Sequence, residues 1–475
     1  MTWPSAPSLA RAVVFAGVLL GIVLGFVAGA ERPARANGRL PATSTITFRH
    51  GHESDIAVGL TFGLLLSHDG GKTWTWMCEA AVGYGGMYDP SYAYTSSGAL
   101  FATTFNGLTA MRNGCTFDAT AEGRSFVSAS TIGPDGTLYY GAAQAADTQN
   151  GLAADFKIYK LADAPAATPV AIKLPETGDV NVWWQSIQVA PSDPQTIYLS
   201  GYRYVPQTGG GTMREHRMFR TVNGGTSWSA LPTTGMTLMA NSVIHLAGIW
   251  SNDPTHLYAR VELVDNTQSD AVYVSTNAGA SWTEINRKAT TIGAFVVRAA
   301  ANLGGTHDLI LGTVALGAEI SHDDGQTWVP LAGAPHMGCL VENAAGELWA
   351  CTQNYSVSTA PSDGAGIMKT TDLATWTKVL RYQELTDAAS CGSDTLQQQA
   401  CVPLWCAVCA QLGCTAAASY GCAVPVEAPI TTPMGKAGCC DTGGGAGGPL
   451  VFALSVATVL LRRRRCSPRA RPRDS

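Results

Sequence analysis

Apolar and polar positions alternate in short runs along residues 43–380, and turn clusters rich in glycine, proline and aspartate separate the runs. Such runs predict β-strands joined as hairpins. One set of seven hairpins spans residues 45–60, 92–104, 127–141, 185–201, 243–261, 295–313 and 338–352. A second hairpin follows each of them, and these end near Trp74, Phe117, Lys173, Trp228, Trp282, Trp328 and Trp376. The region is therefore a series of four-stranded repeats.

The repeats are roughly 45 to 60 residues long, a period typical of β-propeller blades, because one blade cannot bury both of its faces alone. Charged residues make up 14% of the chain and 52 of its 475 residues are glycine, as in turn-rich β proteins. We predict an all-β fold with one propeller over residues 43–380, built from seven four-stranded blades. A six-bladed ring with an irregular insertion is the alternative, because the second and third repeats are weak.

A short motif closes the second hairpin of most repeats. Residues 67–74 read S-H-D-G-G-K-T-W. Close copies occupy residues 221–228, 275–282 and 321–328, and weaker copies end at Trp376 and Phe117. Its aspartate or asparagine, with a hydroxyl residue two positions earlier, can hydrogen-bond the backbone of a tight turn, while the glycine supplies a positive φ. The tryptophan can bury a large apolar surface. The hairpin at residues 157–173 has lost the motif.

This motif resembles the Asp-box, or BNR, repeat of sialidases, sortilin-like receptors and related β-propellers. Each copy is a self-capped turn with an aromatic anchor, so we predict a structural role for it and no chemistry. The predicted box residues are Ser67, Asp69, Gly71, Trp74, Asn223, Gly225, Trp228, Asn277, Gly279, Trp282, Asp323, Gly325, Trp328, Asp372 and Trp376.

The boxes also fix the face on which each loop lies. If the strands of a blade are named A to D from the centre outwards, the A–B and C–D turns share one face. The B–C and D–A connections share the other. The boxes fall in C–D turns, whereas the long insertions fall at B–C connections, over residues 142–156, 202–216, 263–271 and 353–366. Loops on a rigid scaffold commonly carry binding sites, so the face opposite the boxes is the predicted binding face.

Aromatic and hydrogen-bonding residues are frequent in the connections of that face, and such groups suit sugars or peptide segments. The alternative is that several of them only pack their own loops. The candidate ligand-binding residues are Tyr84, Tyr88, Asp89, Trp183, Trp184, Tyr202, Arg203, Tyr204, Arg214, Glu215, His216, Asn354 and Tyr355.

Both ends of the chain differ from the repeats. Residues 12–30 form an apolar run behind Arg11, followed by small-x-small sites, which predicts a secretory signal peptide over residues 1–36. An uncleaved membrane anchor is the alternative, because the run could nearly span a bilayer.

Near the other end, residues 424–442 form a linker with a Gly-Cys-Cys motif, and residues 443–465 combine an apolar stretch with an arginine cluster. The apolar stretch predicts a transmembrane helix with the arginines on the cytoplasmic side. This end resembles the MYXO-CTERM sorting tail of myxobacteria, which implies a protein at the cell surface or outer envelope of a bacterium, anchored in the membrane at least transiently. A plain C-terminal anchor is the alternative.

Thirteen cysteines in an exported chain predict disulfides. Cys339 and Cys351 flank one hairpin and are predicted to pair, and Cys78 and Cys115 are predicted to pair between the first two repeats. Six cysteines between Cys391 and Cys422 predict a disulfide-stapled segment over residues 388–423 with little core of its own. The C-x-x-C at Cys406 could serve a metal or redox role, but no histidine follows Cys391, so no metal site is predicted.

The charge balance bears on possible partners. The whole chain has a formal net charge of −5, and without residues 1–36 and 462–475 it holds 20 Lys and Arg against 33 Asp and Glu. A negative surface repels phosphate backbones, which argues against nucleic-acid binding and favours neutral or cationic partners.

The sequence lacks the motifs of the catalytic propellers that it resembles. Sialidases carry an F-R-I-P motif and six blades, whereas here Phe48-Arg49 is followed by His50, and no motif marks three possible triad arginines, Arg203, Arg260 and Arg298. Xyloglucan-cleaving glycoside hydrolases also carry Asp boxes on seven blades, but they place paired acids between two propellers. This chain has room for one propeller, and no spacing distinguishes its possible acids Asp89, Asp155 and Glu215.

The resemblance to the photosystem II assembly propeller also covers seven blades, and it implies no activity. We therefore predict an exported, surface-anchored propeller that binds an extracellular glycan or protein without catalysis or a cofactor. The alternative is a glycoside hydrolase, sialidase-like or endoglucanase-like, that acts on extracellular polysaccharide.

Overall fold

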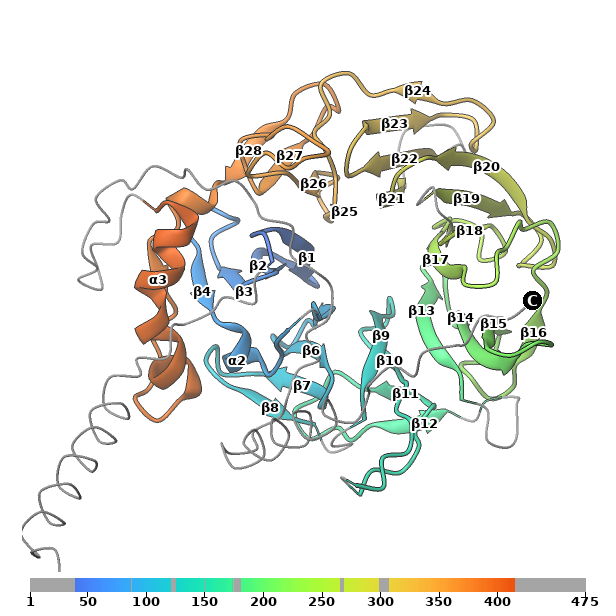
Figure 1. Cartoon of the computed structure of the whole chain (residues 1–475), viewed down its shortest axis with the longest axis horizontal. Helices are drawn as coiled ribbons and strands as arrows, with labels where there is room; N and C mark the ends of the chain where they lie inside the picture. Colours follow the sequence, from blue (N-terminus) through green and yellow to red (C-terminus); the bar gives the residue numbers. More distant parts are fainter. Residues whose placement is uncertain are drawn as a thin grey trace, which may run out of the picture. The chain divides into compact units, whose positions relative to one another are not determined.

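The computed structural model describes residues 39–414 apart from 87, 121–124, 150, 173, 175–180, 265–268 and 299–306. Within this part of the chain the strands form seven sheets, arranged in a ring around a central opening (Figure 1). The all-β, seven-bladed propeller is confirmed, and the six-bladed alternative is wrong. The chain divides into two compact units, residues 1–424 and 425–475, and all the described residues belong to the first.

In every blade the order of strands along the chain is also their order in the sheet. Blade 1 consists of β1 (Thr43–Arg49), β2 (His52–Leu60), β3 (Gly63–Ser67) and β4 (Thr75–Met77). Blade 2 consists of β5 (Tyr92–Tyr94), β6 (Leu100–Thr104), β7 (Gly107–Met111) and β8 (Phe117–Ala119). Blade 3 consists of β9 (Val127–Ile132), β10 (Leu138–Ala142), β11 (Ile158–Leu161) and β12 (Val170–Ile172). Blade 4 consists of β13 (Trp183–Ala190), β14 (Asp193–Pro206), β15 (Thr212–Thr221) and β16 (Ser229–Leu231).

The last three blades follow the same plan. Blade 5 consists of β17 (Val243–Ile249), β18 (Leu257–Glu262), β19 (Asp270–Ser275) and β20 (Thr283–Lys288). Blade 6 consists of β21 (Ile292–Arg298), β22 (Asp308–Thr313), β23 (Gly317–Ser321) and β24 (Val329–Pro330). Blade 7 consists of β25 (Cys339–Glu342), β26 (Leu348–Cys351), β27 (Ile367–Thr370) and β28 (Thr377–Leu380). Outside the blades lie α2 (Glu79–Val82), the short helices η1 (Tyr382–Glu384) and η2 (Gln397–Cys401), strand β29 (Asp387–Ala388) and helix α3 (Val402–Leu412).

The core lies between the blades. Strands β3, β6, β7, β10 and β22 are buried along their whole length, because neighbouring sheets cover both of their faces. The outermost strands β16 and β24 are largely exposed. This explains why the middle strands of a repeat are continuously apolar, whereas the other strands alternate.

The Asp boxes brace the C–D turns. In blade 1 the Ser67 hydroxyl donates to Asp69 and accepts the Gly71 N–H, each at 2.9 Å, and Asp69 accepts the Thr73 N–H at 2.9 Å. The hydrogen bonds from Thr73, above all, lower the pKa of Asp69 to about 2. The boxes of blades 4, 5 and 6 repeat these contacts. A Cβ on Gly71 would lie 3.0 Å from the Trp349 ring of blade 7, so glycine also lets the box pack against the preceding blade.

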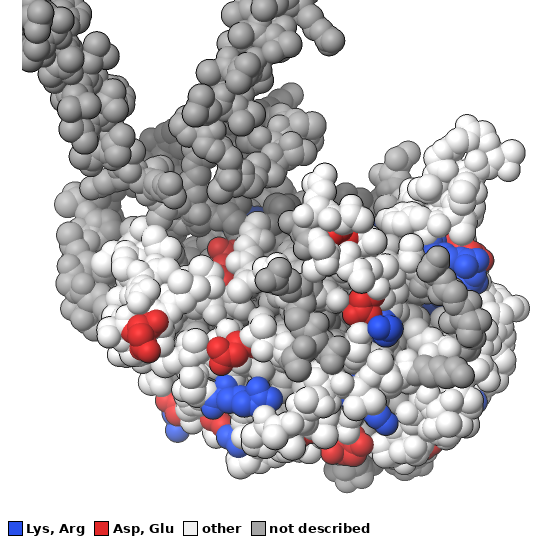
Figure 2. All heavy atoms as spheres, turned by 90° about the horizontal axis from the view of Figure 1, so that it is seen from below, with Lys and Arg blue, Asp and Glu red and all other residues white. Residues whose placement is uncertain are grey.

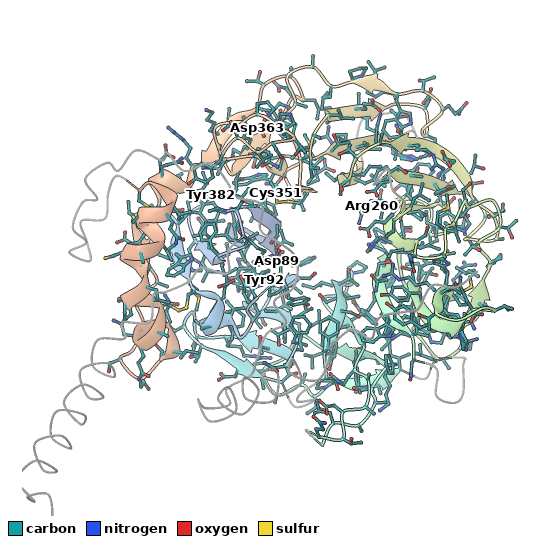
Figure 3. The ribbon with its side chains drawn as sticks, viewed as in Figure 1. Asp89, Tyr92, Arg260, Cys351, Asp363 and Tyr382 are labelled. Atoms are coloured by element: carbon teal, nitrogen blue, oxygen red, sulfur yellow. A yellow bond between two sulfur atoms is a disulfide. The ribbon has the colours of Figure 1, made fainter. Side chains whose placement is uncertain are left out.

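The ring closes between blades 7 and 1 without exchanging a strand. The Thr43 hydroxyl on β1 lies 2.6 Å from the Tyr382 hydroxyl and donates to Gly366 O at 3.0 Å, at the seam beside the labelled Tyr382 (Figure 3). The chain then continues past blade 7, and β29 pairs in parallel with β4 on the outer edge of blade 1. Closure therefore depends on side-chain contacts and on this continuing segment.

We call residues 381–414 the C-terminal clasp. Its helix α3 lies beside blade 1 (Figure 1), where Trp405 is fully buried and its ring is 5.4 Å from that of Trp76. Two disulfides tie the clasp to the first two blades, Cys78–Cys401 and Cys115–Cys391.

The predicted bridge between Cys339 and Cys351 is present, whereas the predicted Cys78–Cys115 bridge is wrong. Cys78 and Cys115 lie in consecutive repeats, which made them the natural pair along the chain. Their actual partners are 323 and 276 positions away and belong to the clasp, and no local sequence pattern marks such a contact.

Several predicted segments lie outside the described residues: the signal peptide at 1–36, residues 415–423 of the cysteine-rich segment, the linker at 424–442 and the transmembrane helix at 443–465. Among the described residues, every helix is too short or too polar to cross a membrane.

Candidate functional site

The B–C hairpin of blade 4 projects beyond its own sheet. Strands β14 and β15 pair continuously from Ile197 and Thr221 out to Pro206 and Thr212. The inner strand β13 pairs with β14 only as far as Trp183 opposite Tyr202. We call residues 202–216 the blade-4 arm, because beyond Tyr202 only these two strands continue. Six of the thirteen candidate ligand-binding residues lie on the arm.

One face of the arm carries two tyrosine rings in edge-to-face contact. Because side chains alternate along a strand, Tyr202 and Tyr204 lie on the same face, with their rings 5.4 Å apart at 76°. The Arg214 guanidinium lies over the Tyr202 ring, 4.4 Å from its centroid. Burial raises the pKa of Tyr202 to about 12, so its hydroxyl is neutral. Tyr204 is 50% exposed, so its ring is available to a ligand.

Trp183 stands at the base of this tyrosine pair. It pairs with Tyr202 across the strands, is partly buried, and its ring lies 5.8 Å from that of Phe156 in an edge-to-face arrangement. Trp183 therefore continues the aromatic surface from the arm towards blade 3.

Polar contacts hold the arm in place. Glu215 accepts a hydrogen bond from Arg203 at 2.6 Å and forms an ion pair with Arg217 at 3.0 Å. The hydrogen bond from Arg203 is the main cause that lowers the pKa of Glu215. The His216 Nε2 lies 2.9 Å from Ser242 O, so this nitrogen donates, and burial lowers the pKa of His216. The Arg214 N–H donates to Ala240 O at 3.0 Å. The arm is thus fixed to the following D–A connection before any ligand binds.

The candidates of blades 1 and 2 are engaged in the fold. Tyr84 is 8% exposed and donates its hydroxyl to Leu60 O at 2.9 Å. The Tyr88 hydroxyl donates to Val127 O at 3.1 Å, and Asp89 forms a bidentate ion pair with Arg39 at 2.7 and 2.8 Å. These residues serve the packing of their own connection.

Trp184 and the blade-7 candidates are also internal. Trp184 is fully buried and its indole donates to Phe156 O at 2.9 Å. Asn354 is 6% exposed and accepts the Tyr382 N–H at 3.0 Å, while Tyr355 donates to Leu412 O of the clasp at 2.7 Å. These residues pack their own loops, which was the alternative to ligand binding.

Sequence reasoning missed a second aromatic surface on the same face. Phe105, in the B–C turn of blade 2, is 52% exposed and stacks on Phe126 with ring centroids 4.9 Å apart at 21°. Its ring also lies 4.5 Å from that of Tyr88. An apolar residue in the four-residue turn T-F-N-G could have indicated this surface, but the second repeat is one of the two that match the repeat pattern least well.

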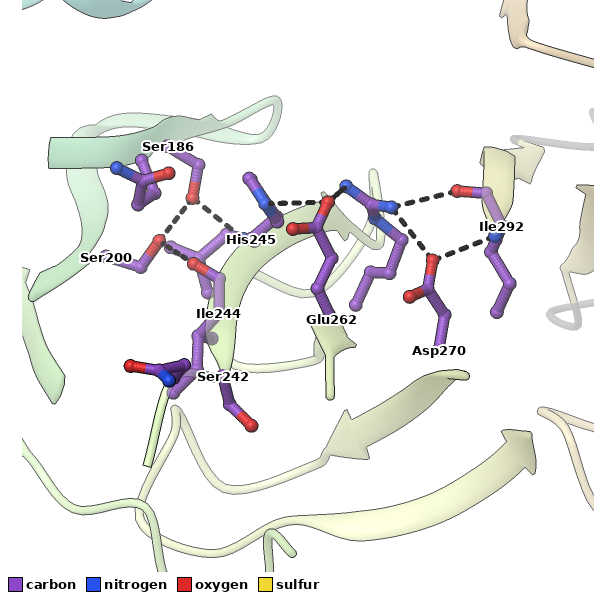
Figure 4. Close-up of polar contacts among 12 residues, drawn as sticks. Ser186, Ser200, Ser242, Ile244, His245, Glu262, Asp270 and Ile292 are labelled. Atoms are coloured by element: carbon purple, nitrogen blue, oxygen red, sulfur yellow. Dashed lines mark hydrogen bonds and ion pairs between the residues drawn. The ribbon is translucent and has the colours of Figure 1, made fainter. Parts of the chain in front are cut away.

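A charge network joins blades 5 and 6 near the central opening (Figures 3 and 4). Arg260 binds Glu262 and Asp270 through different guanidinium nitrogens, each at 3.0 Å, and Asp270 also accepts the Ile292 N–H at 2.8 Å. His245, 3.6 Å away, and Arg260 lower the pKa of Glu262 to about 2. Burial raises the pKa of Asp270, whose side chain is 6% exposed. The network holds paired carboxylates, and both are bound by the same guanidinium.

The opposite face, which carries the boxes, contains a cavity of about 500 Å³ at the ends of the inner strands of blades 7 and 1 to 4. Its wall includes Phe48, His50, Glu53, Tyr92 and Tyr94. Tyr92 stands beside the central opening, across from Arg260 (Figure 3). No candidate from the sequence lies in this cavity.

No protein-family model matches the sequence, and neither does any curated protein sequence. Among solved structures, the chain is similar to an ancestral GH74 enzyme at 14% identity, covering 65% of this chain and 43% of that one, with a TM-score of 0.46. It is similar to the GH74 xyloglucanase of Xanthomonas campestris at 16% identity, covering 69% and 57%, with a TM-score of 0.34. It is also similar to YCF48 bound to D1 peptide at 12% identity, covering 54% and 66%, with a TM-score of 0.32.

The chain spans about half the length of the two GH74 enzymes. These neighbours are β-propellers, and at such identities the likeness concerns the fold alone. The protein is a seven-bladed β-propeller.

Proposed function

We propose that this protein is an exported, surface-anchored propeller that binds an extracellular glycan through the blade-4 arm, without catalysis. The observation that carries the proposal is the half-exposed Tyr204 ring on a braced arm, beside Tyr202, Arg214 and Trp183. Aromatic faces next to fixed hydrogen-bonding groups suit the apolar faces and hydroxyls of sugars. Because the arm is held in place, binding costs little additional ordering.

The surface charge supports an uncharged ligand. On the side drawn in Figure 2, which looks at the edge of the ring from below, basic and acidic side chains of the described residues are interspersed over a mostly uncharged surface. At the arm, Arg203 and Arg217 pair with Glu215, and Arg214 lies over the Tyr202 ring, so these cations are engaged within the arm. The chain as a whole is acidic, which disfavours a strongly anionic polymer, so we expect a neutral polysaccharide.

A non-catalytic role is supported by the state of the carboxylates near the arm and its face. Glu215 and Asp89 are each bound by arginine, and Asp155 accepts the Tyr159 hydroxyl at 2.9 Å. A glycosidase needs two carboxyl groups facing each other across a sugar, one of them able to donate a proton. Carboxylates already held by cations are poor general acids.

Export is supported by the disulfides of the described residues, since such bonds form and persist in oxidising compartments. The apolar run behind Arg11 and the C-terminal arginine cluster add a route out of the cytoplasm and an anchor.

The experiment is retention of the purified protein on a panel of insoluble neutral polysaccharides and printed glycans. The double variant Trp183→Ala, Tyr204→Ala should lose about 100-fold in affinity or more, as expected for central aromatic contacts. Val222→Ala is the matched control, because Val222 is 56% exposed at the opposite end of the same blade, and it should bind like the unaltered protein. Absence of retention on the whole panel, or full retention of the double variant, contradicts the proposal.

A glycoside hydrolase is the second candidate, and the Arg260 network favours it over other catalytic roles. Glu262 and Asp270 share one guanidinium and have pKa values shifted in opposite directions, as in acid and base pairs. The low exposure of Asp270 counts against it, because a sugar ring must reach both carboxyl groups. Release of sugar from sialosides, xyloglucan or β-glucans that Glu262→Gln abolishes would establish this alternative in place of the proposal.

A further inference from the structure

Three side chains that can bind a metal ion, with a tyrosine hydroxyl among them, meet on the box face between blades 5 and 6, away from the blade-4 arm. His256 ends the A–B turn of blade 5, and Tyr258 follows on β18. His307 directly precedes β22 of blade 6, and Asp324 lies in the Asp box of blade 6. The cluster therefore joins two neighbouring blades, because each blade contributes two of its residues.

The donor atoms are spaced like a coordination shell. His256 Nε2 lies 3.1 Å from the Asp324 carboxylate, and His307 Nε2 lies 3.3 Å from it. One ligand atom from each of the three residues lies within 4.8 Å of the others. Around a tetrahedral zinc ion with bonds of about 2.0 to 2.1 Å, neighbouring donors stand roughly 3.3 Å apart. The Tyr258 hydroxyl contacts His256 Nε2, His307 Nε2 and Asp324, so it lies among the three donors and turns aside when an ion enters.

Asp324 brings a carboxylate to a position where the other boxes have none. It is the fourth residue of its box and has φ of 61°, in the left-handed region. Two other boxes have glycine there, Gly70 and Gly224, and two have the apolar residues Ala278 and Leu373. A side chain costs energy in this conformation, although aspartate tolerates it better than most residues. A carboxylate that contacts the two histidines gives a reason for an aspartate at this position.

The box of blade 6 does not need this carboxylate. Ser321 and Asp323 make the bracing contacts: Ser321 accepts the Gly325 N–H at 2.8 Å, and Asp323 accepts the Thr327 N–H at 2.8 Å. Asp324 points instead to the two histidines and Tyr258. Asp323 therefore stabilises the turn, and the adjacent Asp324 belongs to the cluster.

The two imidazoles are held by their surroundings, and the cluster is open to solvent on the side of Asp324. His256 and His307 are 8% and 5% exposed, and the Trp250 ring lies 4.6 Å from that of His307. The Asp324 side chain is 30% exposed, so an ion can reach the donors from solvent. Imidazole nitrogens with one carboxylate suit zinc and related transition metals, whereas calcium takes six to eight oxygen ligands.

We propose that His256, His307 and Asp324, with the Tyr258 hydroxyl beside them, bind a divalent transition-metal ion of the zinc class that fastens blade 5 to blade 6. The three protein ligands come from both blades, so one ion links them, and a water or the reoriented Tyr258 hydroxyl completes the tetrahedron. Such an ion would stabilise the ring at a seam far from the disulfides of the clasp.

The test uses the whole purified protein, treated with a chelator, dialysed and titrated with Zn²⁺ alone. One equivalent should bind, the Tm should rise by several degrees, and X-ray absorption at the zinc edge should show two imidazole ligands. Asp324→Gly introduces the glycine that the boxes of blades 1 and 4 have, so it should fold well without metal and yet bind Zn²⁺ at least about 100-fold more weakly. His307→Ala should show the same loss of affinity.

His322→Ala is the matched control, since His322 is an exposed histidine of the same box that pairs with Asp308 at 2.7 Å, and it should bind Zn²⁺ normally. The proposal is overturned if no equivalent binds, or if Asp324→Gly and His307→Ala both bind Zn²⁺ as the unaltered protein does. It is also overturned if Cys409→Ser, Cys414→Ser abolishes binding, because the buried thiols of the clasp would then hold the ion.

Discussion

The blade-4 arm and the B–C loop of blade 7, residues 353–366, occupy equivalent places on the same face, yet they use their tyrosines in opposite ways. On the arm, Tyr204 projects into solvent with half of its surface exposed. In the blade-7 loop, Tyr355 turns inward, donates to Leu412 O at 2.7 Å and lies 5.9 Å from the Tyr382 ring. The difference lies in the neighbour: the clasp runs past blade 7, and nothing comparable among the described residues covers the arm.

The comparison shows that loop position and residue type do not by themselves define a binding surface. The same aromatic residue becomes a ligand platform or an internal contact, depending on which segment lies against it. If this is correct, disturbing the clasp should affect the blade-7 loop and leave the arm unchanged.

The largest effect is expected when the clasp is cut loose. Replacing Cys78, Cys401, Cys115 and Cys391 by alanine removes both bridges of the clasp, and in chain-entropy terms closing the longer loop, of sequence separation 323, by itself contributes about 6 kcal/mol to the free energy of unfolding. Cys339→Ala, Cys351→Ala is the matched control, because that bridge has a separation of 12 and contributes about 3 kcal/mol on the same basis. Urea unfolding measures both losses.

Hydrogen exchange of the clasp variant adds the regional test. Exchange should rise in residues 353–366, which lose their cover, and should stay unchanged in residues 202–216. Equal losses of stability in the two cysteine variants, or a matching rise of exchange in the arm, would contradict the contrast between the two loops.

A smaller effect is expected from a single hydroxyl. Tyr355→Phe removes the donor to Leu412 O and leaves that carbonyl without this partner, so the free energy of unfolding should fall by about 0.5 to 1.5 kcal/mol. Tyr204→Phe is the matched control on the arm and should leave the stability unchanged. A stability loss in Tyr204→Phe as large as in Tyr355→Phe would show that the arm tyrosine is also an internal contact.

The smallest effect concerns pH. Arg203 and Arg217 lower the pKa of Glu215 below its usual value, so its ion pairs contribute above that usual value and are lost as the pH falls through the lowered pKa. Ligand affinity should therefore weaken modestly between about pH 5 and pH 3 while the fold persists. In Glu215→Gln the affinity should be lower at neutral pH and should no longer depend on pH in this range. A steeper pH dependence in Glu215→Gln than in the unaltered protein would exclude this explanation.

The blades were predictable because each box is made by residues within one turn: Ser67, Asp69 and Gly71 contact one another directly. The orientation of single aromatic residues was not predictable. Trp183 and Trp184 are adjacent on β13 and so face opposite sides, and only the pairing of Trp184 with Gly201 and its contact with Phe156 show which one is buried. The partner of Tyr355 is 57 residues away in the clasp, beyond the reach of any local pattern.

The most direct measurement replaces residues 203–215 by Asn-Gly, a two-residue turn that suits a hairpin and keeps Tyr202 opposite His216. The shortened protein is then tested on the polysaccharides that retain the unaltered one. The account predicts an unchanged Tm and complete loss of retention, because the exposed part of the aromatic surface is gone and the seven sheets remain. Retention at full affinity by a protein without its arm would contradict the assignment of the binding site.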